Sequence, residues 1–220
     1  PNTGAITVAD NSSIDFDTDA SLTLTVTVKD EYFTSAAATI TINLTNVNDN
    51  APVVTASQVI SVSESAPLNV VVGAVAATDA DDNNQAGYTH FRRWQIVSGN
   101  GSATFVIDPN TGELKRNSNN SLDFEKATSY LIRVQVSDGK HTSAVEEVTI
   151  SIVNENDNKP EIQGQPWYTI EDWTADNDPV GFAKALDADD KNEPGFTTFS
   201  NWQIVGGTGA AVFAIDATTG

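Results

Sequence analysis

Acidic side chains recur at fixed stations along this 220-residue sequence, singly or in pairs separated by one residue. Carboxylates brought together repel by about 1 kcal/mol per pair at 4 Å even in water, so a cluster of them requires a cation. Calcium takes six to eight oxygen ligands from carboxylates, amide carbonyls and the backbone. The stations are Glu64, Asp79, Asp81, Asp123, Glu125, Asp138 and Asp157. They predict calcium binding.

A period of 108 residues runs through the chain. The tetrapeptide WQIV begins at Trp94 and again at Trp202, DADD begins at Asp79 and Asp187, and NDN recurs at the same spacing. A strict period of this kind indicates a tandem array of one structural unit.

The repeat boundaries follow from two polar segments, NVNDNAP at 46–52 and NENDNKP at 154–160. If each repeat ends at the proline, residues 1–52 are the last part of one repeat, 53–160 are a complete repeat and 161–220 are the first part of another. We expect the natural chain to continue at both ends. The alternative is that copies complete one another head to tail by strand donation.

Segments rich in Val, Ile and Thr that alternate apolar and polar residues predict strands, and no long segment has helical periodicity. The predicted strands are 21–30, 39–47, 58–64, 69–79, 93–99, 129–138 and 144–153. About seven strands per repeat predict an all-β chain of tandem seven-stranded Greek-key β-sandwiches of immunoglobulin type, in a head-to-tail array. Strand ends gather at the two poles of such a sandwich, so the acidic stations would meet where consecutive repeats join.

Five motifs of the complete repeat form a pattern: Glu64 ending the first strand, DAD at 79–81, LDFE at 122–125, the lone Asp138 and the linker at 154–160. This set resembles tandem cadherin repeats, and the likeness covers the whole chain. The resemblance implies cadherin-type sandwiches at the cell surface, forming a calcium-rigidified stalk of an adhesin or surface filament that mediates adhesion. It also implies up to three calcium ions at each junction between repeats.

The resemblance further implies a ligand set for each junction. At the first junction the set is Asp15, Asp17, Asn48, Asp49, Asn50, Asp79, Asp81 and Asp138. At the second it is Glu64, Asp123, Glu125, Asn156, Asp157, Asn158, Asp187 and Asp189. The chain departs from the family pattern at Asn46 and Asn154, where the family has Asp, and at Asp17, where it has Glu. The shorter Asp17 leaves the ion count at the first junction open.

Composition excludes several classes of function. Thirty acidic residues against eleven basic ones give a net charge of −19, which argues against nucleic acid and anionic membranes as partners. The chain has no cysteine, so we expect neither disulfides nor thiolate-bound metal, and it has no apolar segment near the roughly 20 residues that span a membrane. Its two histidines do not recur with the period, and no catalytic motif is present, so we expect no enzyme activity.

An aromatic group gives an alternative function. Trp167, Tyr168 and Trp173 have no aromatic counterparts in the complete repeat, whereas Trp94 and Trp202 recur and are expected in the core. Local packing of the first strand explains the group simply, and a carbohydrate or partner site is the competing interpretation. The partners we expect are therefore calcium ions, neighbouring repeats or copies of the chain, and a homophilic or carbohydrate ligand. The regular period and the absence of cysteine favour a microbial surface protein.

Overall fold

The computed structural model describes residues 4–118, 121–164 and 167–219. The chain divides into two compact units. The first comprises Pro1–Ile60, Pro67–Asn119 and Leu131–Ile150, and the second comprises Ser61–Ala66, Asn120–Tyr130 and Ser151–Gly220.

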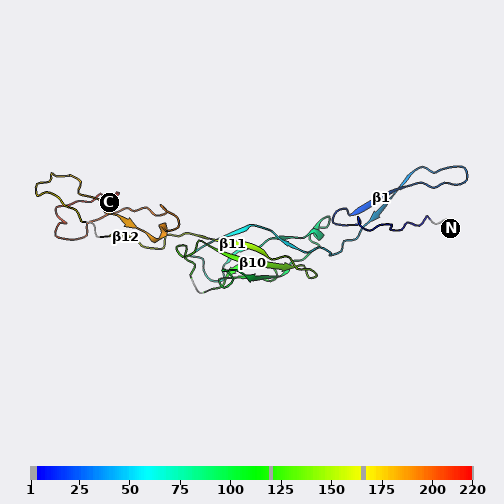
Figure 1. Cartoon of the computed structure of the whole chain (residues 1–220), viewed down its shortest axis with the longest axis horizontal. Helices are drawn as coiled ribbons and strands as arrows, with labels where there is room; N and C mark the ends of the chain where they lie inside the picture. Colours follow the sequence, from blue (N-terminus) through cyan, green and yellow to red (C-terminus); the bar gives the residue numbers. More distant parts are fainter. Residues whose placement is uncertain (1–3, 119–120, 165–166, 220) are drawn as a thin grey trace. The chain divides into compact units, whose positions relative to one another are not determined.

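Strands dominate the described residues, and the two helical elements are single 3₁₀ turns, η1 (Ala80–Asp82) and η2 (Ala188–Asp190). The strands, drawn as arrows in Figure 1, are β1 (Ser21–Val26), β2 (Ala38–Asn43), β3 (Val53–Val54), β4 (Gln58–Ser63), β5 (Val71–Ala74), β6 (Ala77–Thr78), β7 (Arg92–Ser98), β8 (Phe105–Ile107), β9 (Glu113–Arg116), β10 (Ser129–Ser137), β11 (Glu146–Val153), β12 (Glu161–Ile162) and β13 (Ala185–Leu186). The prediction of an all-β chain is confirmed.

Two sheets lie in the region between residues 58 and 153. One has four strands in the order β4-β11-β10-β7, and the other has three in the order β5-β9-β8. The alternation that predicted half-buried strands appears directly in β10 and β11, where Ile132, Val134, Val148 and Ile150 are all completely buried. Trp94 of β7 is buried, as expected of a core residue. Seven strands in these two sheets match the predicted sandwich.

The predicted strand 69–79 is two strands, because its two ends pair with different partners. β5 pairs with β9 and has an irregular register between Val71 and Gly73, whereas β6 pairs with β3. A Cβ added at Gly73 would lie 2.7 Å from the Ile60 side chain, so glycine permits this close approach. β8 and β9 were not predicted, since segments of three and four residues are too short for alternation to stand out.

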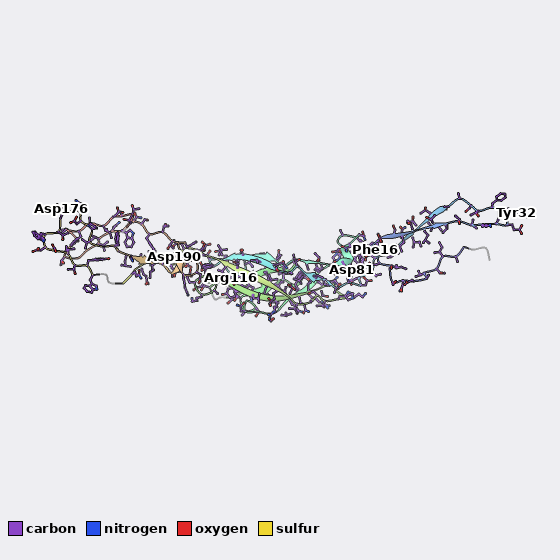
Figure 2. The ribbon with its side chains drawn as sticks, turned by 45° about the horizontal axis from the view of Figure 1, so that its top comes forward. Phe16, Tyr32, Asp81, Arg116, Asp176 and Asp190 are labelled. Atoms are coloured by element: carbon purple, nitrogen blue, oxygen red, sulfur yellow. The ribbon has the colours of Figure 1, made fainter. Side chains whose placement is uncertain are left out.

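The 108-residue period recurs in the structure. The pairs β1 and β10, β2 and β11, β3 and β12, β6 and β13, and η1 and η2 each begin 108 residues apart. β1 and β2 form an antiparallel hairpin with Ser21 opposite Asn43 and Val26 opposite Ala38. Tyr32 lies in the loop between them and is strongly exposed (Figure 2).

No helix within the described ranges has the length and apolar character needed to cross a bilayer.

Candidate metal centre

The two DAD motifs have the same local structure. Asp79 caps the N-terminus of η1, where its side chain accepts a hydrogen bond of 3.0 Å from the amide of Asp81. Asp187 does the same for η2 through the amide of Asp189, at 3.1 Å. The turn directs the third residue of the motif inward, and Asp81 and Asp189 are both completely buried. A buried carboxylate at the end of a strand requires partners or a cation.

Five carboxylates of the first compact unit come together, and we call them the first cluster: Asp17, Asp49, Asp79, Asp81 and Asp138. Carboxylate oxygens of Asp79, Asp81 and Asp138 lie within 4.8 Å of one another, as do oxygens of Asp17, Asp49 and Asp81. Two oxygens bound to one calcium at about 2.4 Å can be at most about 4.8 Å apart. Asp81 belongs to both groups and therefore joins them.

The linker contributes amide groups to the first cluster. The Asn50 side-chain amide donates hydrogen bonds of 2.7 Å to Oδ2 of Asp17 and 2.7 Å to Oδ1 of Asp81. The backbone amides of Asp49 and Asn50 also reach Asp81 Oδ1, at 3.3 and 3.2 Å. The predicted linker residues therefore lie against the DAD turn.

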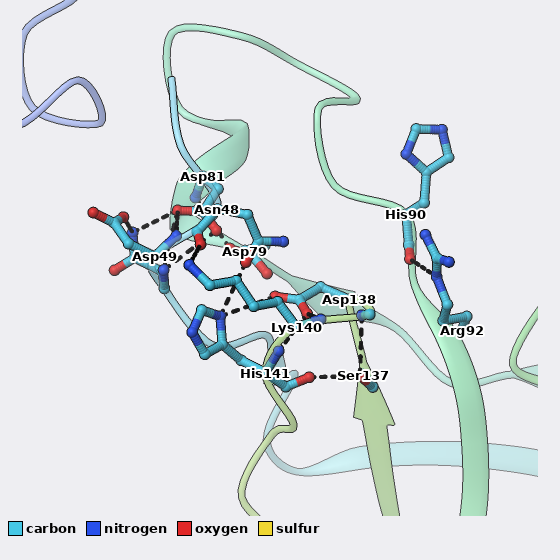
Figure 3. A network of polar contacts seen from close by, with 12 residues as sticks. Asn48, Asp49, Asp79, Asp81, His90, Arg92, Ser137, Asp138, Lys140 and His141 are labelled. Carbon is cyan, nitrogen blue, oxygen red and sulfur yellow. Dashed lines mark hydrogen bonds and ion pairs between the residues drawn. The ribbon is translucent and has the colours of Figure 1, made fainter. Parts of the chain in front are cut away.

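Figure 3 shows a further contact of the linker, made with the turn after β10. Lys140 Nζ donates to the backbone oxygen of Asn48, and His141 Nδ1 lies 3.0 Å from Asn48 Oδ1. Oδ1 of Asp138 accepts the backbone amides of Lys140 and His141 at 2.6 and 2.7 Å. The sequence pattern assigned no role to Lys140 or His141, and the equivalent positions 108 residues earlier are occupied by Tyr32 and Phe33.

Burial, neighbouring charges and hydrogen bonds shift the pKa values of carboxylates in the first cluster. Burial raises the pKa of Asp17 and of Asp79, and neighbouring carboxylates add to each shift. Burial also acts to raise the pKa of Asp81 and of Asp138, but hydrogen bonds outweigh it and both pKa values are lowered. In Asp81 these bonds come from Asn50 and Asp49, and in Asp138 from the amides of His141 and Lys140. These hydrogen bonds thus favour the charged form of the buried Asp81 and Asp138 carboxylates.

The second compact unit contains a smaller group, which we call the second cluster: Glu64, Glu125 and Asp157. Their oxygens also lie within 4.8 Å of one another. Glu64 is buried, and its two oxygens accept the backbone amides of Phe124 at 2.6 Å and Glu155 at 2.7 Å. Burial, followed by the charges of its acidic neighbours, raises the pKa of Glu125.

The remaining residues predicted for the second junction have other contacts. Asn158 donates to Oδ1 of Asp189 at 2.7 Å and to Oδ1 of Asp157 at 2.8 Å, so it links the linker to the second DAD turn. Asp123 forms an ion pair of 2.5 Å with Lys126, which lowers the pKa of Asp123. Asn156 is exposed.

Two sets of predicted residues lie apart from these clusters. Asp15 is exposed and accepts hydrogen bonds within its own turn, from the amide of Asp17 at 2.9 Å and the hydroxyl of Thr18 at 2.8 Å. Trp167 and Trp173 are 88% and 82% exposed. Tyr168 is half exposed, and its hydroxyl donates a hydrogen bond to the backbone oxygen of Phe182.

The departure from the family pattern at the first linker position has a structural explanation. Asn46 is buried, and its side-chain amide donates a hydrogen bond of 2.8 Å to the backbone oxygen of Asp81. Asn154 is also buried and donates one of 2.9 Å to the backbone oxygen of Asp189. An ionised aspartate has no donor and could not form this bond. Asn84 and Asn192 likewise donate to the backbone oxygens of Phe16 and Phe124, each at 2.8 Å. Identity at the 108-residue period is the signal that could have identified these asparagines.

Unpaired oxygens within the clusters fit a metal ion. Four carboxylate oxygens are buried and accept no hydrogen bond: Oδ1 of Asp17, Oδ2 of Asp79, Oε1 of Glu125 and Oδ2 of Asp138. Buried acceptors normally find a partner, because an unpaired one costs about 1–3 kcal/mol. Hard, oxygen-ligated cations such as calcium are the partners that such a donor set suits.

Comparison with known proteins agrees with this geometry. Residues 58–153 match the family model of the cadherin domain. The chain is 36% identical over 153 residues to human protocadherin gamma-B6, covering 69% of this chain and 16% of that protein. It is 32% identical over 187 residues to pig protocadherin-11 X-linked, covering 83% of this chain and 16% of that protein.

Solved structures have the same fold. The human desmocollin-1 ectodomain superposes with a TM-score of 0.61 at 25% identity, over 80% of this chain and 34% of that one. The protocadherin gammaB4 extracellular domain also has a TM-score of 0.61, at 18% identity, over 94% of this chain and 34% of that one.

The chain therefore belongs to the cadherin family. Cadherin domains are extracellular adhesion modules that generally bind calcium, and they are not enzymes, so the predicted family, fold and general function are confirmed. The chain spans only about a sixth of each curated relative named here. These relatives are animal proteins; the microbial origin stays a prediction.

Proposed function

We propose that this chain is a calcium-bridged segment of an extracellular stalk, in which ions at the two clusters order the linkers 46–50 and 154–158. The observation that carries the proposal is the buried group of Asp79, Asp81 and Asp138, whose oxygens lie within 4.8 Å of one another. Three buried carboxylates beside one another favour a divalent cation strongly, since an ion removes both their repulsion and their unpaired acceptors.

The proposed ligands are those that the cadherin resemblance implies for each junction. Calcium would supply positive charge there, and the chain's own residues would hold the linker against it. Asn50 already donates to both Asp17 and Asp81, and Asn158 to both Asp157 and Asp189. A linker fixed by these bonds and by ions loses conformational freedom, and that restriction is what stiffness of the stalk requires.

The repeat boundaries 1–52, 53–160 and 161–220, and up to three ions per junction, belong to the same proposal. The 108-residue offset between equivalent strands supports the boundaries. The two groups of three carboxylates that share Asp81 support more than one ion at the first junction. Neighbouring repeats of the chain or of its copies, and a homophilic ligand, are the protein partners that we propose.

Calorimetric titration of the 220-residue chain with calcium, combined with small-angle scattering, tests the proposal. We expect several sites and a larger maximum dimension in millimolar calcium than in chelator. Ligands that bind only the ordered state stabilise it by about 2.7 kcal/mol per site at a hundredfold excess, so the melting temperature should also rise with calcium. Equal scattering and equal melting in calcium and in chelator would refute the proposal.

The exposed aromatic group supports a second candidate, a carbohydrate or partner site. Trp167 and Trp173 present their rings to solvent, and Trp173 Nε1 donates 2.9 Å to Glu171. Exposed indole rings beside a carboxylate suit stacking and hydrogen bonding with a sugar. Glycan-array binding of the wild type and of Trp173→Ala tests this site. Both proteins keep the buried core residue Trp94. Identical glycan profiles for the two proteins would exclude Trp173 from any such site.

A further inference from the structure

His141 is a nitrogen donor placed at the edge of the first cluster. Its Nδ1 atom lies 3.0 Å from Asn48 Oδ1 and 3.5 Å from Asp138 Oδ2 (Figure 3). The His141 side chain is 31% exposed, whereas that of Asp138 is 0% exposed. The imidazole therefore stands between solvent and the buried carboxylates.

The distances from His141 Nδ1 to the two oxygens suit a shared metal ion. Ligands bound to one transition metal ion at about 2.0–2.2 Å lie about 2.8–3.1 Å apart at the octahedral angle and about 3.3–3.6 Å apart at the tetrahedral angle. The Asp138 Oδ2 atom is buried and accepts no hydrogen bond, while Oδ1 of the same carboxylate is occupied by two backbone amides. One oxygen thus remains available beside the imidazole nitrogen.

We propose that the first cluster takes a divalent first-row transition metal ion, such as Zn²⁺, through His141, Asp138 and Asn48, in competition with calcium. Imidazole nitrogen is a preferred ligand of Zn²⁺ and its neighbours, whereas calcium prefers oxygen alone. The inference rests on the proposed function, because it assumes that the first cluster is an ion site.

Charge and composition support the assignment. Asp79, Asp81 and Asp138 form one buried group of three carboxylates, and the Lys140 ammonium donates to the backbone oxygen of Asn48. The sequence has two histidines, His90 and His141, so the second cluster has no comparable nitrogen donor. The second cluster is therefore an internal reference that should bind calcium without preferring Zn²⁺.

Titration of the whole chain with Zn²⁺ alone, and with Zn²⁺ in the presence of calcium, tests the proposal. The variants are His141→Ala and, as a matched control, His90→Ala, whose side chain is exposed and away from the carboxylates in Figure 3. We expect His141→Ala to weaken the tightest Zn²⁺ site at least tenfold and to change calcium affinity less than twofold. His90→Ala should behave as the wild type.

Nitrogen-15 NMR of the imidazole rings gives a second readout that needs no variant. The Nδ1 resonance of His141 should shift on addition of one equivalent of Zn²⁺, and that of His90 should not. Unchanged Zn²⁺ affinity in His141→Ala, or an unshifted His141 resonance, would overturn the transition-metal site while leaving calcium binding intact. Loss of calcium binding from the wild type itself would instead overturn the proposed function.

Discussion

The two acidic clusters share two pairs of residues 108 positions apart, Asp17 with Glu125 and Asp49 with Asp157, and they differ in their remaining members. In the second cluster both oxygens of Glu64 accept backbone amides, at 2.6 and 2.7 Å. In the first cluster Asp79 and Asp138 each keep one buried oxygen without a hydrogen bond. The equivalent residues agree, since Asp17 and Glu125 each keep one buried oxygen without a hydrogen bond. The clusters differ where the period relates no residues, because there the backbone satisfies Glu64 and leaves oxygens of Asp79 and Asp138 for an ion.

The clusters also differ in their neighbouring cations. Lys140 and His141 contact the linker at the first cluster through Asn48. At the second, Lys126 pairs with Asp123, and Lys191 donates 2.7 Å to the backbone oxygen of Glu125. Basic side chains thus hold the linker itself at the first cluster, whereas at the second they bind the loop of residues 123–125.

Asp81→Asn should cause the largest difference in calcium affinity between the two clusters. Asp81 belongs to both groups of the first cluster, so its loss removes a shared charge from each. We expect calcium affinity at the first cluster to fall on the order of a hundredfold, about 2.8 kcal/mol, with the second cluster unchanged in calorimetry. Asp189→Asn, its equivalent at the 108-residue period, should affect only the second. If both variants bind calcium as the wild type does, the DAD motifs are not ligands.

Asn46→Asp and Asn154→Asp compare the two linkers directly. Each replaces a side-chain donor to the backbone oxygen of Asp81 or Asp189 and adds a negative charge beside it. We expect losses of about 1–2 kcal/mol in the free energy of unfolding, measured by chemical denaturation in chelator. The loss should be larger for Asn154→Asp, since the side-chain amide of Asn154 also donates a hydrogen bond of 3.4 Å to Oε2 of Glu193. A loss for Asn154→Asp no larger than that for Asn46→Asp would contradict repulsion by Glu193.

Asp79→Asn should stabilise the protein in chelator at neutral pH. Burial raises the pKa of Asp79 above its ordinary value of 3.8, so the ionised form opposes folding and stability falls as pH rises through the raised pKa. Asparagine keeps an oxygen that can cap η1. We expect a gain of about 1 kcal/mol at pH 7 that vanishes below pH 3.8, measured by denaturation at both values, and a weaker response to calcium. A gain independent of pH would rule out this electrostatic origin.

Asn84→Ala and Asn192→Ala should have the smallest effect. Asn84→Ala removes side-chain hydrogen bonds of 2.8 and 3.1 Å to the backbone oxygens of Phe16 and Asp17. Asn192→Ala removes one of 2.8 Å to the backbone oxygen of Phe124. Net losses for such bonds are about 0.5–1.5 kcal/mol, and Asn84 and Asn192 are exposed, so we expect values near the lower end. Hydrogen exchange of the turns at 15–19 and 123–127 measures the effect locally. Unchanged exchange in both turns would show that these bonds do not order them.

Much of the fold and part of the candidate site could be predicted from two patterns, the strict 108-residue period and the alternation of apolar and polar residues. Period-two alternation reflects one buried face, and it correctly predicted β10 and β11. The contacts of Lys140 and His141 with Asn48 could not be predicted, since they join residues 92 and 93 positions apart and the equivalent positions in the first hairpin hold Tyr32 and Phe33.

The sequence by itself determined the all-β class, the 108-residue period and the residue types that attract a cation, because these depend on local periodicity and composition. Only the tertiary structure decided which faces are buried and which oxygens stay unpaired. Val134 in β10 is completely buried, whereas Val26, its equivalent in β1, is 36% exposed. β10 lies between two strands of a four-stranded sheet, whereas β1 belongs to a two-stranded sheet with β2 among the residues that the structure describes, so the same side chain meets different neighbours.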